Sequence, residues 1–73
     1  MKEKIKEIMA SVLNIEIDKI SDNSSPDTIE AWDSLKQMDL IISIEEEFNI
    51  EFSDEELVVD TYAGLVKIVK DNL

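Results

Sequence analysis

Apolar residues recur at helical spacing along this chain, and very little interrupts them. Its 73 residues include a single glycine, Gly64, and a single proline, Pro26. Because β-hairpins usually need glycine in their turns, this scarcity favours helices joined by loops. A chain of this length is expected to form one domain, residues 1–73, and to bury only about 60% of the surface that its unfolded form exposes. The sequence therefore predicts a small all-α bundle.

Capping residues divide the pattern into helices. Asn14 can end a first helix and Asn49 a second, because asparagine tolerates the left-handed conformation of a helix C-terminus. Ser53 and Glu56 have the spacing of a capping box at the start of a short third helix. The expected helices cover, in order, about 5–13, 34–48, 53–59 and, from 60 or 61, at least as far as 69.

A long connection, about 15–33, separates the first two predicted helices. Loops of this length are usually functional or disordered. Apolar residues spread along this one favour a structured loop that packs on the core at those points: Ile15, Ile17, Ile20, Ile29 and Trp32.

The second predicted helix has two distinct apolar regions when its residues are placed at ~100° intervals. The core face is expected to contain Met38, Leu40, Ile41, Ile44 and Phe48. A separate line alternates aliphatic and acidic residues, namely Leu35, Asp39, Ile42 and Glu46. Single exposed aliphatic residues are common, and the long loop could cover either one. The alternative is a docking stripe, in which the aliphatic residues supply affinity and the carboxylates steer a partner.

The formal net charge is −11, from eighteen acidic residues and seven lysines. Between Asp22 and Asp60, thirteen acidic residues are offset only by Lys36. Such a segment repels nucleic acid and anionic membranes and attracts basic protein surfaces, although it also simply favours solubility. No apolar run is long enough to span a membrane, and the first residues lack the apolar core of a signal peptide. We expect a cytoplasmic monomer that does not insert into membranes.

Ser34 follows Asp33 at the start of the second predicted helix. The chain has no histidine or cysteine, and Lys36 would not face Ser34 on a helix, so no base is at hand to make this serine a catalytic nucleophile. Ser34 can cap the helix, with Gln37 completing a capping box. Alternatively, Asp33 caps the helix and leaves the Ser34 hydroxyl facing solvent. A phosphate ester on Ser34 would then lie near the positive end of the helix dipole.

These residues resemble those of a known family. The segments Asp33-Ser34-Leu35, Ile44-Glu45-Glu46-Glu47-Phe48 and Ile50-Glu51-Phe52, together with Leu40, are similar to the acyl carrier proteins. The predicted helices, the long first loop and the acidity agree, so the resemblance covers essentially the whole chain. It implies a four-helix carrier bundle, with three main helices and one short helix, and a protein without catalytic activity.

The resemblance also implies roles for individual residues. Ser34, in the motif with Asp33, would carry a phosphopantetheine arm that a phosphopantetheinyl transferase adds from coenzyme A. The thiol of this arm would hold acyl groups as thioesters, and acyl-loading and acyl-transfer enzymes with basic docking surfaces would exchange them. The residues implied to face such partners are Asp33, Leu35, Asp39, Ile42, Glu45 and Glu46. Acyl chains would lie between the helices, beside Met38, Ile41, Leu57, Val58 and Ile68.

Two positions differ from carriers of the fatty-acid type. Lys36 stands where those carriers often have an acidic residue, and Ala31-Trp32 stands where they usually have glycine and a small residue. This arrangement is more similar to stand-alone carriers of specialised pathways, so a fatty-acid, lipid or specialised-metabolite pathway stays open. An aminoacyl or peptidyl carrier would share the fold and the arm. An unmodified acidic helical adaptor for a basic partner is the third hypothesis.

No pattern in the sequence indicates an active site or a metal site. The chain lacks histidine, cysteine and arginine. Asp22-Asn23-Ser24 is not followed by the glycine and glutamate of a calcium-binding loop. Clusters such as Asp54-Glu55-Glu56 are expected to attract cations only through charge screening.

Overall fold

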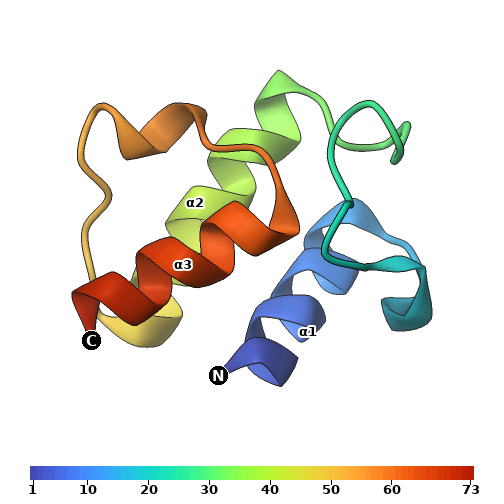
Figure 1. The fold of residues 1–73 in the computed structure, drawn as a ribbon. Coiled ribbons are helices and arrows are strands. Elements are labelled where there is room, and N and C mark those ends of the chain that lie inside the picture. Colours follow the sequence, from blue (N-terminus) through green and yellow to red (C-terminus); the bar gives the residue numbers. More distant parts are fainter.

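The computed structural model describes all 73 residues and contains three α-helices, two short 3₁₀ helices and no strand. In Figure 1, α3 lies in front of α2, α1 lies to one side of both, and the two termini are at the same end of the molecule. The predicted all-α bundle is confirmed. The short third helix is only a 3₁₀ turn, and the first connection contains a second such turn. The elements are α1 (Lys2–Leu13), η1 (Ile17–Lys19), α2 (Ser34–Phe48), η2 (Glu56–Val58) and α3 (Tyr62–Asn72).

The predicted capping residues end and begin the helices as expected. Asn14 and Asn49 follow α1 and α2 in the left-handed conformation, with φ of 56° and 55°. The predicted capping box precedes η2. The Ser53 N–H donates to Glu56 Oε1 over 2.8 Å, and the Glu56 N–H donates to Ser53 Oγ over 3.3 Å. These local hydrogen bonds fix where each helix meets its loop.

Gly64 lies in the first turn of α3, against the chain that leads into this helix. Its N–H donates to Oγ1 of Thr61, the N-cap residue, over 3.0 Å. A Cβ atom at this position would lie 2.5 Å from Cγ1 of Val59 and 2.8 Å from Oγ1 of Thr61. Glycine is therefore favoured here because the segment between η2 and α3 packs directly on the backbone of the helix.

The core consists of fifteen buried apolar residues contributed by the three helices and the connections. From α2, it includes Leu40, Ile41 and Ile44, which are at most 1% exposed. Met38, which was predicted to lie on the same face, is 46% exposed. At ~100° per residue Met38 falls about 40° from Ile42, and therefore outside the buried face. Its assignment to the core was wrong.

The first connection packs onto the core, as predicted, but not at every expected residue. Ile20, Ile29 and Trp32 are buried and Ile15 is partly buried, as the prediction required. Ile17 is exposed because it belongs to η1, a turn that buries none of its residues. Three buried anchors and one partly buried residue hold this connection in place.

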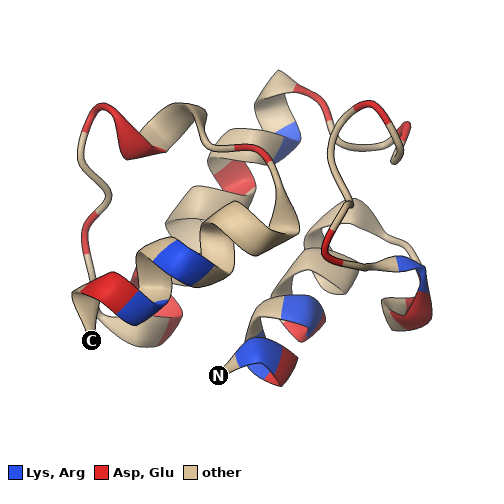
Figure 2. Cartoon of the chain, viewed as in Figure 1, with Lys and Arg blue, Asp and Glu red and all other residues tan.

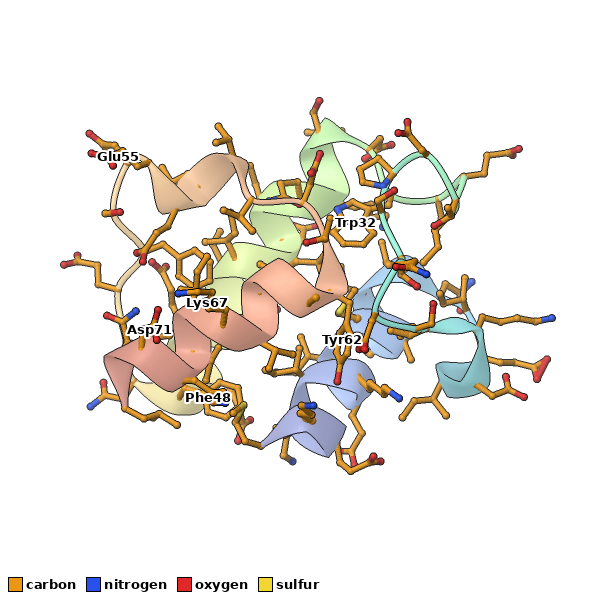
Figure 3. All side chains as sticks on the ribbon, viewed as in Figure 1. Trp32, Phe48, Glu55, Tyr62, Lys67 and Asp71 are labelled. Carbon is orange, nitrogen blue, oxygen red and sulfur yellow. The ribbon has the colours of Figure 1, made fainter.

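Tyr62 joins the start of α3 to both α1 and the first connection (Figure 3). Its N–H donates to the carbonyl of Ser24 over 3.1 Å, and its hydroxyl donates to the carbonyl of Lys2 over 3.4 Å. Burial raises the pKa of the Tyr62 hydroxyl, and the negative charges of Asp22 and Glu3 raise it further.

None of the helices combines the length and the apolar character needed to cross a membrane.

Candidate functional site

Asp33 caps α2, and Ser34 is the first residue of that helix. The carboxylate of Asp33 accepts the N–H of Lys36 at Oδ1 over 2.9 Å, and its carbonyl accepts the N–H of Gln37 over 2.8 Å. Ser34 is exposed, and its hydroxyl makes no hydrogen bond within the protein. The second of the two predicted arrangements is therefore the one observed, with the serine hydroxyl free for chemistry.

The surroundings of Ser34 fit a phosphate ester. The N–H groups of Ser34 and Leu35 have no hydrogen-bond partner in the protein and lie at the start of a helix of fifteen residues. Unpaired N–H groups and the helix dipole both stabilise negative charge at this end. The residues around Ser34 can therefore hold the phosphate of a covalently attached group.

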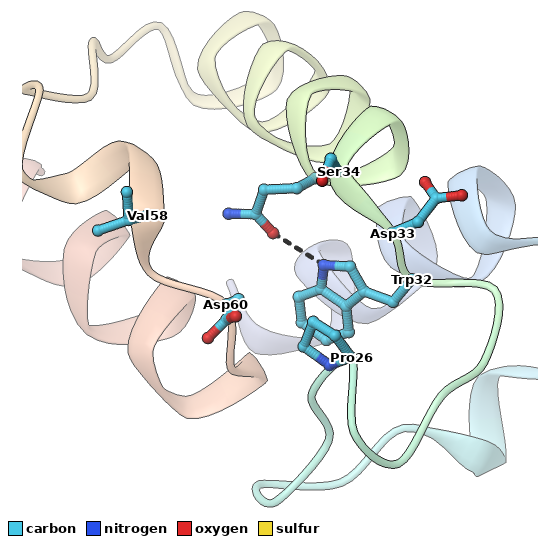
Figure 4. Close-up of a pocket in the computed structure, with 7 residues that line it drawn as sticks. Pro26, Trp32, Asp33, Ser34, Val58 and Asp60 are labelled. Atoms are coloured by element: carbon cyan, nitrogen blue, oxygen red, sulfur yellow. Dashed lines mark hydrogen bonds between the residues drawn. The ribbon is translucent and has the colours of Figure 1, made fainter.

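Gln37 links three segments near Ser34, instead of completing a capping box. Its Oε1 accepts the indole N–H of Trp32 over 2.8 Å, the bond drawn as a dashed line in Figure 4. Its Nε2 donates to the carbonyls of Leu57 and Val59 over 3.2 and 2.7 Å. These three bonds fasten the end of the first connection and the η2 segment to the first turn of α2.

A pocket of about 350 Å³ lies beside Ser34 (Figure 4). It is formed by segments far apart in the sequence, because the Gln37 bonds bring the η2 segment close to the first connection. The other two pockets of the molecule contain no residue of the predicted attachment site. The lining residues are Pro26, Trp32, Asp33, Ser34, Gln37, Val58 and Asp60.

The four residues of the predicted docking stripe, Leu35, Asp39, Ile42 and Glu46, all face solvent. Leu35 is 78% exposed and Ile42 is 49% exposed. The alternative in which the long loop covers these two residues is therefore wrong. The half-exposed Met38 lies close to Ile42 in angle around α2 and enlarges the apolar part of this surface.

Glu45 differs from the other acidic residues predicted to face a partner. It is partly buried, and its Oε2 accepts the N–H of Phe52 over 2.8 Å. This bond holds the chain that follows α2 against the end of the helix. One oxygen of the Glu45 carboxylate is thus engaged in structure, whereas Asp39 and Glu46 are fully available on the surface.

The charges are distributed unevenly over the fold. Figure 2 shows acidic residues along both connections and on α2, while the lysines lie mainly on α1 and α3. On α3, Lys67 donates to Oδ2 of Asp71 over 2.9 Å, and this hydrogen bond raises the pKa of Lys67. No three acidic side chains are grouped closely enough to hold a metal ion. Because the lysines lie mainly on α1 and α3, the surface around Ser34 on α2 has few cationic side chains of its own.

Sequence reasoning identified Ser34, Asp33 and the stripe, but not the rest of the pocket. Pro26 and Asp60 have no signal in the sequence that would place them beside Ser34, and the resemblance connects Val58 only with an acyl chain. The spacing of Gln37 from Ser34 predicts only a capping box. Its position one turn after Ser34 is the signal for its observed role, because a long amide side chain there can reach across to a neighbouring segment.

A small helical protein with an exposed serine at a helix N-terminus, beside a pocket and an acidic stripe, has the architecture of a carrier domain. The family profile described as "Phosphopantetheine attachment site" matches residues 3–69. The acyl carrier protein of Petrotoga mobilis is 36% identical over 73 residues, which cover 97% of this chain and 85% of that protein. The acyl carrier protein of Buchnera aphidicola subsp. Schizaphis graminum is 49% identical over 57 residues, 77% of this chain and 71% of that protein.

The chain belongs to the acyl carrier protein family. It is thus a non-catalytic carrier with a covalently attached phosphopantetheine group.

Proposed function

We propose that this carrier bears its phosphopantetheine on Ser34 and shuttles acyl groups between enzymes of a fatty-acid, lipid or specialised-metabolite pathway, with residues 1–73 acting as one carrier domain. The observation that carries this proposal is the exposed Ser34 hydroxyl in the first turn of α2, left free because Asp33 provides the cap. When bound, the group supplies a thiol that holds acyl groups as thioesters.

Attachment requires the Oγ of Ser34 to reach the diphosphate of a coenzyme A molecule held by a phosphopantetheinyl transferase. The new Oγ–P bond forms as the P–O bond of the diphosphate breaks. The leaving 3′,5′-ADP takes the electron pair, and the hydroxyl proton passes to a base of the transferase. The exposed hydroxyl and the unpaired N–H groups of Ser34 and Leu35 support this role.

Partner enzymes are proposed to dock on the stripe of α2. Leu35 and Ile42 offer apolar contacts, and Asp39 and Glu46 offer charges on the same side of the helix. Asp33 and Glu45 extend the negative surface at its two ends. A partner with a basic surface around an apolar depression complements this arrangement.

The test is the intact mass of the protein after incubation with coenzyme A and a broad-specificity transferase. We expect a gain of one phosphopantetheine in the wild-type protein and in Ser43→Ala, and no gain in Ser34→Ala. Ser43 is the matched control because it is the other serine of α2. Circular dichroism should show that both variants are folded, since Ser34 is exposed and caps nothing.

A mass gain that persists in Ser34→Ala would place the arm elsewhere. No gain in a folded wild-type protein, with a transferase proven on another carrier, would contradict the proposal and favour an unmodified adaptor that binds through the docking stripe.

A further inference from the structure

We propose that Gln37 closes the route from Ser34 into the helical core, so that this carrier takes short acyl groups that stay outside the core instead of long aliphatic chains. The inference rests on the proposed attachment at Ser34. Family membership leaves the chemical class of the cargo open.

The position of Gln37 makes it the residue that an inserting chain would meet. It lies three residues after Ser34, so the two side chains project from the same side of α2. From there its amide spans the gap between α2 and the η2 segment, with bonds of 3.2 and 2.7 Å to the carbonyls of Leu57 and Val59. An alkyl chain leaving the arm toward the core would have to pass through this bridge.

Breaking the bridge would leave polar groups without partners. The amide of Gln37 uses its oxygen for the indole N–H of Trp32 and its nitrogen for two carbonyls, and all these bonds are partly buried. An alkyl chain can neither donate nor accept a hydrogen bond, so it cannot replace them. Insertion is therefore opposed by the same three bonds that shape the pocket.

The residues that the family resemblance implied for an internal acyl chain do not form a continuous lining. Ile41 and Ile68 are buried within the packed core and Leu57 is partly buried against it, whereas Met38 and Val58 are exposed, Val58 being 77% exposed. A chain between the helices would have to displace packed side chains to reach Ile41. Displacing close-packed core residues is unfavourable unless new contacts compensate for it.

The pocket beside Ser34 offers a place for a short group on the outer side of the bridge. The rings of Trp32 and Pro26 and the side chain of Val58 give it apolar walls, and the carboxylate of Asp60 gives it a polar one (Figure 4). With a volume of about 350 Å³, it can hold a small acyl or aminoacyl group together with part of the arm.

The experiment compares forms of the protein loaded on Ser34 with acetyl-, glycyl- and octanoyl-phosphopantetheine, made with the transferase from the corresponding coenzyme A thioesters. We expect the melting temperatures of the acetyl and octanoyl forms to be equal. Hydroxylamine, which takes the acyl group as a hydroxamate and leaves a free thiol, should cleave both at the same rate. A glycyl form that alone is stabilised would show that the pocket prefers an aminoacyl group, and equal acetyl and glycyl forms would show no preference among short groups.

The proposal would be overturned if the octanoyl form of the wild-type protein melted about 4 °C or more above the acetyl form, or if its thioester were protected from hydroxylamine. Either result would mean that the chain enters the core in spite of Gln37. Failure of all three thioesters to load would instead contradict the proposed attachment at Ser34.

Variants test the bridge itself. Gln37→Leu removes all three hydrogen bonds, and we expect its octanoyl form to melt higher than its acetyl form. Asn72→Leu is the matched control, because Asn72 also donates from its amide to a backbone carbonyl, that of Ile68 over 2.7 Å, at the far end of α3. If Gln37→Leu does not fold, Gln37→Glu keeps an acceptor for Trp32 and removes only the donors to η2. No dependence on chain length in a folded variant would contradict the role of Gln37.

Discussion

The two faces of α2 differ in chemistry although both contain large aliphatic residues. On the inner face, Leu40, Ile41 and Ile44 are at most 1% exposed. On the outer face, Leu35 and Ile42 are 78% and 49% exposed and alternate with acidic residues. Charged groups are costly to bury without partners, so the carboxylates keep the neighbouring aliphatic residues at the surface. One face of the helix thereby serves stability, and the other is the face on which we propose that partners dock.

The largest expected effect is a difference in stability between variants of two isoleucines of α2, Ile44 on the inner face and Ile42 on the outer face. Ile44→Ala removes a fully buried side chain and should lower the free energy of unfolding by about 2–5 kcal/mol. Ile42→Ala removes a half-exposed one and should change it by no more than about 0.5 kcal/mol. Urea unfolding followed by circular dichroism measures both. For modification by the transferase, we expect Ile42→Ala to lower kcat/KM more than Ile44→Ala does.

Two results would break this separation of the faces. One is an equal loss of stability in the two variants. The other is an unchanged kcat/KM for Ile42→Ala, which would remove Ile42 from the docking stripe for this partner. If Ile44→Ala does not fold, Ile44→Val provides a milder change of about 0.5–1.5 kcal/mol.

Asp33 has two roles at the start of α2. It caps the helix, and it carries a negative charge next to Ser34. Asp33→Ala removes the acceptor for the Lys36 N–H and should destabilise the protein by about 0.5–2 kcal/mol. Asp33→Asn keeps an acceptor and should cost less. Both variants lose the charge, so both should be modified more slowly than the wild-type protein. If Asp33→Asn were modified at the wild-type rate, the charge of Asp33 would have no part in recognition.

Glu45 and Glu46 are adjacent, yet only Glu45 has an internal partner. Removing its side chain in Glu45→Ala leaves the partly buried N–H of Phe52 without its acceptor and should cost about 1 kcal/mol. Glu46→Ala should stay within about 0.5 kcal/mol of the wild-type protein. Thermal unfolding of the two variants at the same salt concentration tests this. Equal melting temperatures would show that the bond to Phe52 adds nothing to stability.

The parts of the fold that depend on neighbouring residues could be predicted from the sequence. The start of α2 follows from Asp33, and its end follows from Asn49, because capping is decided by hydrogen bonds and backbone conformations within one turn. The sequence left open whether Asp33 or Ser34 caps the helix, because both residue types are favoured caps, and the structure shows that Asp33 does. The exposure of Leu35 and Ile42 could be anticipated because helical spacing separates them from the core face.

The parts that depend on distant residues could not be predicted. The bonds of Gln37 to Leu57 and Val59 join residues 20 and 22 positions apart, and no pattern in the sequence records such a pairing. The pocket beside Ser34 depends on this bridge and on Pro26 and Asp60 from the two connections. Met38 was misplaced for a different reason, since its angle around α2 is closer to Ile42 than to the core.

The smallest effect concerns the long-range repulsion among the carboxylates of the outer surface. With a net charge of −11, the folded protein concentrates like charges that the unfolded chain spreads apart. Raising NaCl from about 10 mM to about 200 mM shortens the screening length to below about 10 Å, so the melting temperature should rise. The rise should be smaller in Glu46→Gln, which removes one charge from the crowded region. It should be unchanged in Ile42→Ala, which changes shape at the same surface without changing charge. A melting temperature independent of salt would mean that the acidic surface costs the fold nothing, which would leave solubility and the attraction of basic partners as its physical roles.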